Sequence, residues 1–126
     1  MERIKSFVND LSIAALERNT NIAAIAIMSD SGEIIEQTSN WDLKKETQVL
    51  LNVLNGKQSF TLNNINYTIT KRTTEGITGT SEGGMGYVFF VPHEKNIVLS
   101  YAMPQADPIT ALEFLISYTR DNFPKT

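Results

Sequence analysis

The chain of 126 residues contains no cysteine and a single histidine, His93. Without cysteine it can form no disulfide, supply no thiolate to zinc and use no thiol nucleophile. One histidine with no cysteine beside it leaves no recognisable catalytic dyad or triad. The sequence therefore predicts no enzyme, and we interpret His93 as a solvated turn residue.

Basic residues and long apolar runs are also scarce. Lys and Arg number 11 against 14 Asp and Glu, a net charge of −3, whereas binding to nucleic-acid phosphates needs a basic surface. No apolar run approaches the roughly 20 residues that cross a bilayer. The opening MERIKSFVNDL is amphipathic and charged, unlike a signal peptide. We expect a cytoplasmic protein that does not bind nucleic acid.

The residues that are present suit a folded protein. Hydrophobic residues make up 41% and charged residues 20%, which argues against disorder. The length favours one domain that spans residues 1–126.

Residues 59–103 should form the centre of a sheet. We expect three strands there, over residues 59–73, 87–91 and 96–103. A polar turn at 93–96 joins the last two as a β-hairpin. The middle strand is almost entirely apolar, so both of its faces need cover. The glycines of Gly83–Gly86 would let the chain enter this strand, and no helix follows them, so a phosphate loop is not predicted.

Apolar residues at helical spacing predict helices over residues 2–18, 42–55 and 108–122. Ser39 with Asp42 resembles a capping pair for the second helix. Asp107 followed by Pro108 suits the start of the third. We expect one buried face on that last helix, made of Ile109, Leu112, Leu115, Ile116 and Thr119.

Residues 22–38 read as a hairpin, which gives the order α-β-β-α-β-β-β-α. Short turns between the strands predict an α/β (α+β) fold, an antiparallel meander sheet with both terminal helices on one face. Residues 73–84, rich in Thr, Ser and Gly, are expected to be a loop or a short edge strand.

No cofactor or metal site is predicted. The carboxylates of Asp30, Glu33, Glu36 and Asp42 lack the spacing of a calcium loop. Trp41 is interpreted as a core or cap-covering aromatic.

Charged residues gather in three short segments, 71–72, 93–95 and 107–113. A meander could bring the strand end and the turn toward the start of the last helix. A mixed-charge patch of this kind suits a protein partner, because charges at an interface rim orient the two proteins.

The order of elements resembles profilin, the small actin-monomer-binding family. The resemblance is carried by the opening helix, the segment IAAIAIMSDSGEIIEQTS, the strand NYTITKR, Gly83-Gly84-Met85-Gly86 with its hydrophobic strand, IVLSYAM and the closing helix. It implies actin binding through the later strands and the start of the last helix. The residues implied are Lys71, Arg72, Phe89, His93, Lys95, Thr110 and Glu113.

Profilins also hold polyproline in an aromatic groove between their terminal helices, and aromatic faces suit a polyproline II helix. The matching positions here are Ile4, Phe7, Ile35, Tyr118 and Phe123. The family's two groove tryptophans are replaced by Ile4 and Ile35, so weak binding of proline-rich peptides is expected. The acidic balance argues against phosphoinositide binding. These departures indicate a divergent member, such as an archaeal one.

The resemblance implies a monomeric, cytoskeletal protein that regulates actin polymerisation by steric capping of one end of the monomer, without catalysis. The alternative is a roadblock- or longin-like dimeric scaffold that regulates a small GTPase. A small-molecule sensor of the PAS or GAF type, which needs a hollow core, is a third possibility.

Overall fold

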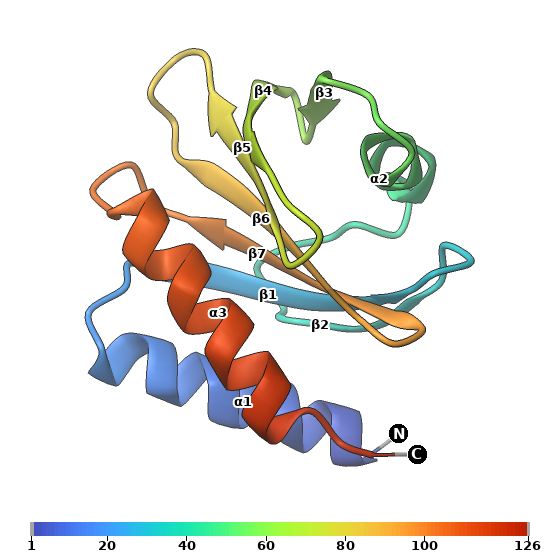
Figure 1. Cartoon of the computed structure of the whole chain (residues 1–126), viewed down its shortest axis with the longest axis vertical. Coiled ribbons are helices and arrows are strands. Elements are labelled where there is room, and N and C mark those ends of the chain that lie inside the picture. Colours follow the sequence, from blue (N-terminus) through green and yellow to red (C-terminus); the bar gives the residue numbers. More distant parts are fainter. Residues whose placement is uncertain (1, 126) are drawn as a thin grey trace.

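A computed structural model describes residues 2–125 as three helices and one seven-stranded antiparallel sheet, in the order β2-β1-β7-β6-β5-β4-β3 (Figure 1). The helices are α1 (Glu2–Glu17), α2 (Thr47–Leu54) and α3 (Pro108–Asn122). The strands are β1 (Ile22–Ser29), β2 (Ile34–Gln37), β3 (Ser59–Leu62), β4 (Ile65–Arg72), β5 (Ile77–Ser81), β6 (Tyr87–His93) and β7 (Asn96–Ala102).

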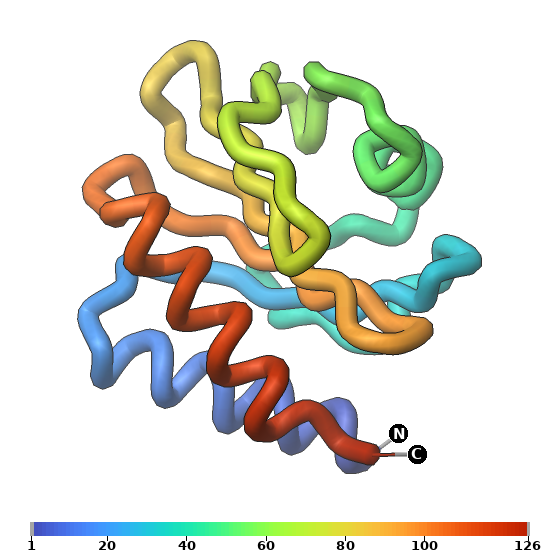
Figure 2. Tube along the Cα trace, in the orientation of Figure 1, coloured from blue at the N-terminus to red at the C-terminus, as the bar shows by residue number. Residues whose placement is uncertain are grey.

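The terminal helices α1 and α3 cover one face of the sheet, and α2 lies on the other (Figure 1). Figure 2 shows the start of α1 beside the end of α3, where the Arg3 guanidinium donates to the Lys125 carbonyl at 2.8 Å. The predicted meander with both terminal helices on one face is confirmed.

Two cores sandwich the sheet, because successive strand residues point to opposite faces. In β6, Val88 and Phe90 pack toward α2, whereas Phe89 and Val91 pack toward α1 and α3. All four side chains are at most 3% exposed. The apolar β6 segment is therefore covered on both faces, as its sequence predicts.

The segment 59–73 is two strands, which corrects the single strand predicted there. Asn63 and Asn64 have φ values of +50° and +68° and make a two-residue turn between β3 and β4. Asparagine tolerates this left-handed conformation, which suits tight hairpins. The β3–β4 hairpin adds an edge to the sheet.

Residues 77–81 form β5, an interior strand between β4 and β6, where a loop or an edge strand was expected. Its small side chains serve close packing. A Cβ atom added at Gly79 would lie 2.9 Å from the Phe60 ring, so the ring rests directly on this backbone. The small and polar residues of β5 therefore reflect close packing in the sheet interior and do not mark a loop.

Helix α2 begins at Thr47, five residues after the predicted start at 42. The predicted capping pair of Ser39 and Asp42 therefore does not cap this helix, whose N-cap residue is Glu46. The Asp42 carboxylate instead accepts from the Lys44 N–H at 3.1 Å. Leu43 is fully buried, and its N–H donates to the Gln37 side-chain carbonyl at 3.0 Å. Because Leu43 is held in this turn, α2 begins further along the chain than the sequence pattern predicts.

Helix α3 begins as predicted. The Asp107 carboxylate accepts from the Ile109 N–H at 3.1 Å and from the Thr110 hydroxyl at 2.9 Å, and Pro108 opens the helix. Ile109 is 58% exposed, so its predicted place on the buried face is wrong. It lies on the flank of the helix beside the sheet end.

Candidate protein-interaction surfaces

An irregularity in β4 directs Lys71 toward α3. Ile69 pairs with Gly79 and Lys71 with Thr78, which leaves Thr70 as an extra residue. Such a bulge re-aims the side chains that follow it. Thr70, Lys71 and Thr78 therefore line a depression of about 230 Å³ together with Pro108 and Ile109. The end of β4 therefore lies next to the start of α3, as the sequence suggested.

Thr110 and Glu113 extend this region along α3. Both are exposed, and both border a second shallow depression with Phe114 on the outer side of the helix. Lys71, Ile109, Thr110 and Glu113 are called the Lys71 surface below. It combines one cation, one anion and an exposed apolar side chain on an ordered helix start.

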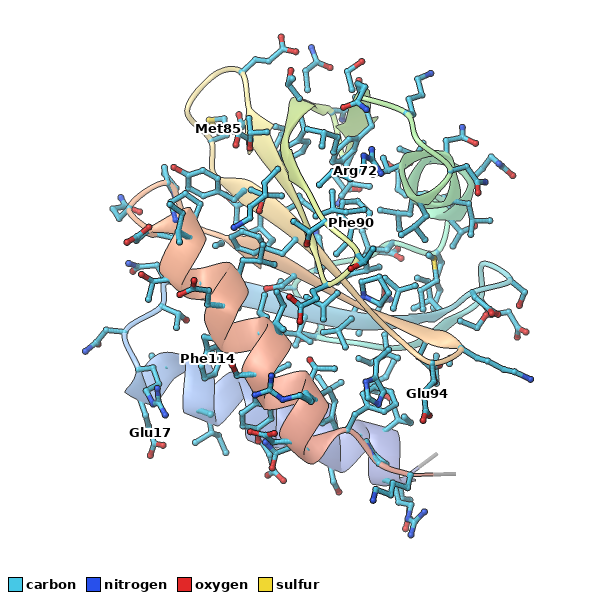
Figure 3. The ribbon with its side chains drawn as sticks, in the orientation of Figure 1. Glu17, Arg72, Met85, Phe90, Glu94 and Phe114 are labelled. Atoms are coloured by element: carbon cyan, nitrogen blue, oxygen red, sulfur yellow. The ribbon has the colours of Figure 1, made fainter. Side chains whose placement is uncertain are left out.

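Arg72 lies on the opposite face. Its guanidinium donates to the Val53 carbonyl and to the Lys57 carbonyl, each at 2.9 Å, and Figure 3 shows it directed toward α2. These bonds tie β4 to the end of α2. The structure thus separates Arg72 from Lys71 and gives it a role in holding the fold together.

Phe89 cannot contact a partner. Its side chain is 0% exposed, and its ring stacks on Tyr87 with centroids 6.2 Å apart beneath the terminal helices. Alternation along β6 directs it inward. Its inclusion among the actin-contacting residues is therefore wrong.

His93 and Lys95 lie at the other end of the sheet from the start of α3. The His93 ring sits 5.0 Å from that of Phe123, which follows the C-terminal end of α3. Seven-residue strands such as β6 and β7 extend by roughly 20 Å, and Figure 3 shows Glu94 in their connecting turn. The predicted charge patch is split in two, because α3 starts near the far end of this hairpin.

The predicted aromatic cluster between α1 and α3 exists. The Phe7 ring lies 4.9 Å from Phe123 and 5.9 Å from Tyr118. Phe7 and Phe123 are only 4% and 7% exposed, so they mostly cover each other. Ile4 and Ile35 are half-buried against the same core and offer no ring face.

An open groove of about 490 Å³ runs beside this cluster. Phe7 and Tyr118 line it with Pro124, and Asp10 and Arg3 stand among the polar residues around it. Burial, with a smaller effect from the Asp10 carboxylate, raises the pKa of the Tyr118 phenol. The Tyr118 phenol, which lines the groove, therefore keeps its proton to a higher pH than a free tyrosine does.

A hollow on the α2 side was not foreseen from the sequence. It measures about 330 Å³ and is bordered by Trp41, Tyr67 and Tyr101. Trp41 is a core aromatic, as predicted, at 8% exposure. The residues come from distant segments, and only the curl of the sheet brings them together, so no local pattern could reveal the site.

Within residues 2–125, no group of three or more His, Asp or Glu residues is arranged to hold a metal ion. In the same range, no helix combines the length and apolar character needed to span a membrane.

The fold defines a small helix-flanked β-sheet protein with open depressions on its surface. No family model matches the chain. The chain is 30% identical over 118 residues to Loki profilin-2 and 29% identical over 130 residues to Loki profilin-1, both from Lokiarchaeum sp. (strain GC14_75). These alignments cover 85% and 94% of both partners, respectively.

Solved structures agree. The profilin of a LokiProfilin2/rabbit actin complex superposes with a TM-score of 0.84 at 28% identity, covering 96% of both chains. A profilin from Schizosaccharomyces pombe, 16% identical, shares the fold with a TM-score of 0.72 over 94% of this chain and 99% of that one. The chain belongs to the profilin family. The predicted resemblance is confirmed, and the roadblock- or longin-like alternative is not favoured.

Proposed function

We propose that this protein binds an actin monomer and thereby regulates actin polymerisation. The observation that carries the proposal is the match to the profilin of the LokiProfilin2/rabbit actin complex, which extends over 96% of both chains. The mechanism is steric. A bound profilin covers one end of the monomer, so that only the opposite end remains free to add to a filament.

The Lys71 surface is the proposed contact. Lys71 and Glu113 supply opposite charges that orient the partner, and Ile109 supplies an apolar contact that is 58% exposed in the free protein. The Asp107 cap holds the first turn of α3 in place, so little ordering is needed on binding. Arg72, Phe89, His93 and Lys95 lie outside this surface.

The chain acts as a monomeric single domain, residues 1–126, in the cytoplasm and at the cytoskeleton. Masking a surface requires no bond making or breaking, so no catalytic group is assigned. The α1–α3 groove is a second proposed site, for proline-rich peptides. Its support is the groove that Tyr118 lines together with Pro124 and the largely covered Phe7. Binding there is weak, because Ile4 and Ile35 provide no stacking surface.

Assembly of pyrene-labelled rabbit actin tests the actin proposal. The wild-type protein should slow spontaneous assembly in proportion to its concentration. Lys71→Glu should weaken actin binding about tenfold, equal to about 1.4 kcal/mol. Lys95→Glu makes the same charge change at the far end of the sheet and should bind as wild type does. No effect of a large excess on either rabbit or archaeal actin would reject the function, whereas equal binding by both variants would reject only the assigned surface.

A further inference from the structure

The hollow on the α2 side lies on the face of the sheet opposite to α1 and α3, apart from the Lys71 surface and the α1–α3 groove. Trp41 precedes α2, Tyr67 comes from β4 and Tyr101 from β7. Ala23 and Ala24 of β1 leave the space that larger side chains would fill. The Asn40 side-chain amide donates to the Ala23 carbonyl at 2.9 Å and holds the Trp41 segment at the rim.

The size and lining of the hollow resemble those of small-molecule sites. Its volume of about 330 Å³ falls at the lower end of the usual range of about 300–1,000 Å³. Among the described residues, three aromatic rings border it and no charged side chain does. An ion would leave water without gaining a counter-charge, so the lining selects against charged ligands.

Two polar groups at the hollow are without partners. Tyr67 is 2% exposed and Trp41 is 8% exposed, yet within residues 2–125 neither the Tyr67 hydroxyl nor the Trp41 indole N–H makes a hydrogen bond. Both atoms keep some exposed surface, since the only fully sealed, unpaired side-chain polar atom in that range is the Thr119 hydroxyl oxygen. Because solvent reaches both donors, a bound acceptor can take the place of water there without breaking a hydrogen bond within the protein.

The other groups nearby are already satisfied. The Tyr101 hydroxyl donates to the Met85 carbonyl, in the β5–β6 loop where Figure 3 places Met85. Burial, with a smaller effect from Tyr101, raises the pKa of Tyr67 to about 12. The Tyr67 hydroxyl is therefore protonated at neutral pH and, like the Trp41 N–H, is a free donor from a residue that lines the hollow.

We propose that this hollow binds a small neutral molecule that combines a flat ring with a hydrogen-bond-accepting carbonyl group. The ring packs among the side chains of Trp41, Tyr67 and Tyr101. The carbonyl oxygen accepts a hydrogen bond from the Tyr67 hydroxyl or from the Trp41 indole N–H. Because α1 and α3 lie on the other face, this site functions separately from the proposed actin and proline-peptide contacts.

Benzamide, benzoate and benzamidine form a matched set of probes, since they share one ring and differ in charge. Trp41 is the only tryptophan of the chain, so its fluorescence reports directly on the hollow. Benzamide should change that fluorescence saturably and shift backbone amide resonances of Ala23, Asn63 and Tyr101. Benzoate and benzamidine should bind at least about fivefold more weakly, because the lining is uncharged.

Variants then test the two donors. Tyr67→Phe should weaken benzamide binding roughly 3- to 10-fold without lowering Tm, because its hydroxyl has no partner to lose. Trp41→Phe keeps an aromatic ring and removes the indole N–H. Because this variant has lost the fluorescent tryptophan, its binding of benzamide is measured by backbone amide shifts. Tyr118→Phe, in the other groove, is the matched control and should bind benzamide normally.

Four results would overturn the proposal. They are no saturable binding of benzamide, equal binding of the three probes, unchanged affinity in both Tyr67→Phe and Trp41→Phe, or a Tyr67→Phe protein of clearly lower Tm. Shifts of the same amides that instead depend on protein concentration, with dimers in light scattering, would assign the hollow to a second copy of the chain and also reject a small ligand.

Discussion

Lys71 and Arg72 are neighbours in the chain but point to opposite faces of the sheet. Lys71 lies beside Pro108 and Ile109 at the start of α3. The Arg72 guanidinium donates to two carbonyl oxygens near the end of α2, each at 2.9 Å. Lys71 therefore lies on the surface that we propose contacts actin, whereas Arg72 belongs to the packing of the fold.

Substitutions at these two positions should have opposite effects. Arg72→Ala should lower the free energy of unfolding by about 1–2 kcal/mol, because two charge-assisted hydrogen bonds are lost at a partly solvated site. Lys71→Glu should change stability by less than about 0.5 kcal/mol and weaken actin binding. Urea unfolding and actin sedimentation measure the two properties. An Arg72→Ala protein of unchanged stability that fails to bind actin would show that Arg72 is a contact residue.

Glycine at the entrance to β6 should be irreplaceable. Gly86 has φ +123°, and an added Cβ would lie 2.3 Å from the Ala102 carbonyl oxygen. Gly86→Ala should therefore cost at least about 2 kcal/mol in thermal or urea unfolding. Gly84→Ala is the control, since its φ is +71° but nothing lies within 4 Å of the added atom, and it should cost about 1 kcal/mol. Equal losses would mean that backbone conformation alone, not the contact with Ala102, requires glycine.

Tyr67 should make the protein sensitive to alkali. Its pKa rises from 10.0 to about 12 in the folded state, chiefly by burial. A raised pKa means that the folded protein holds this proton more tightly than the unfolded chain does. The stabilisation is complete below pH 10 and is lost as the pH rises toward about 12, by up to about 1.4 kcal/mol per pH unit.

The comparison with Tyr67→Phe isolates this effect. Urea unfolding across the same alkaline window should show a shallower loss of stability for the variant, since phenylalanine has no proton to release. Parallel curves for the two proteins would contradict the raised pKa.

The α1–α3 groove should bind a proline decamer with a Kd of about 1 mM, or about 4 kcal/mol of binding free energy. Amide shifts in the NMR spectrum would measure it. Tyr118→Ala should abolish binding, because the ring supplies the stacking face, whereas Tyr118→Phe should retain most of it. Tight binding, or binding that survives Tyr118→Ala, would place the peptide elsewhere.

Local patterns in the sequence determined much of the fold. Helical spacing of apolar residues predicts α1 and α3, the Asp107-Pro108 pair predicts where α3 starts, and apolar runs predict the β6–β7 hairpin. Each of these signals involves residues within a few positions of one another, where backbone preferences and periodicity act directly. The order of these elements was also sufficient to suggest the profilin family.

Tertiary structure alone decided which of these residues can meet a partner. Alternation along β6 requires Phe89 to point away from Phe90. Only the packing of α1 and α3 on the sheet buries the face on which Phe89 lies. Alternation sends Lys71 and Arg72 to different faces, but the extra residue in β4 decides that Lys71 takes the face of α3 and Arg72 the face of α2. The length of β6 and β7 separates His93 from the start of α3. The hollow beside Trp41 depends on strands far apart in sequence that are joined through the curl of the sheet. Long-range placement of this kind leaves no periodic trace in the chain, because it arises from the packing of complete elements.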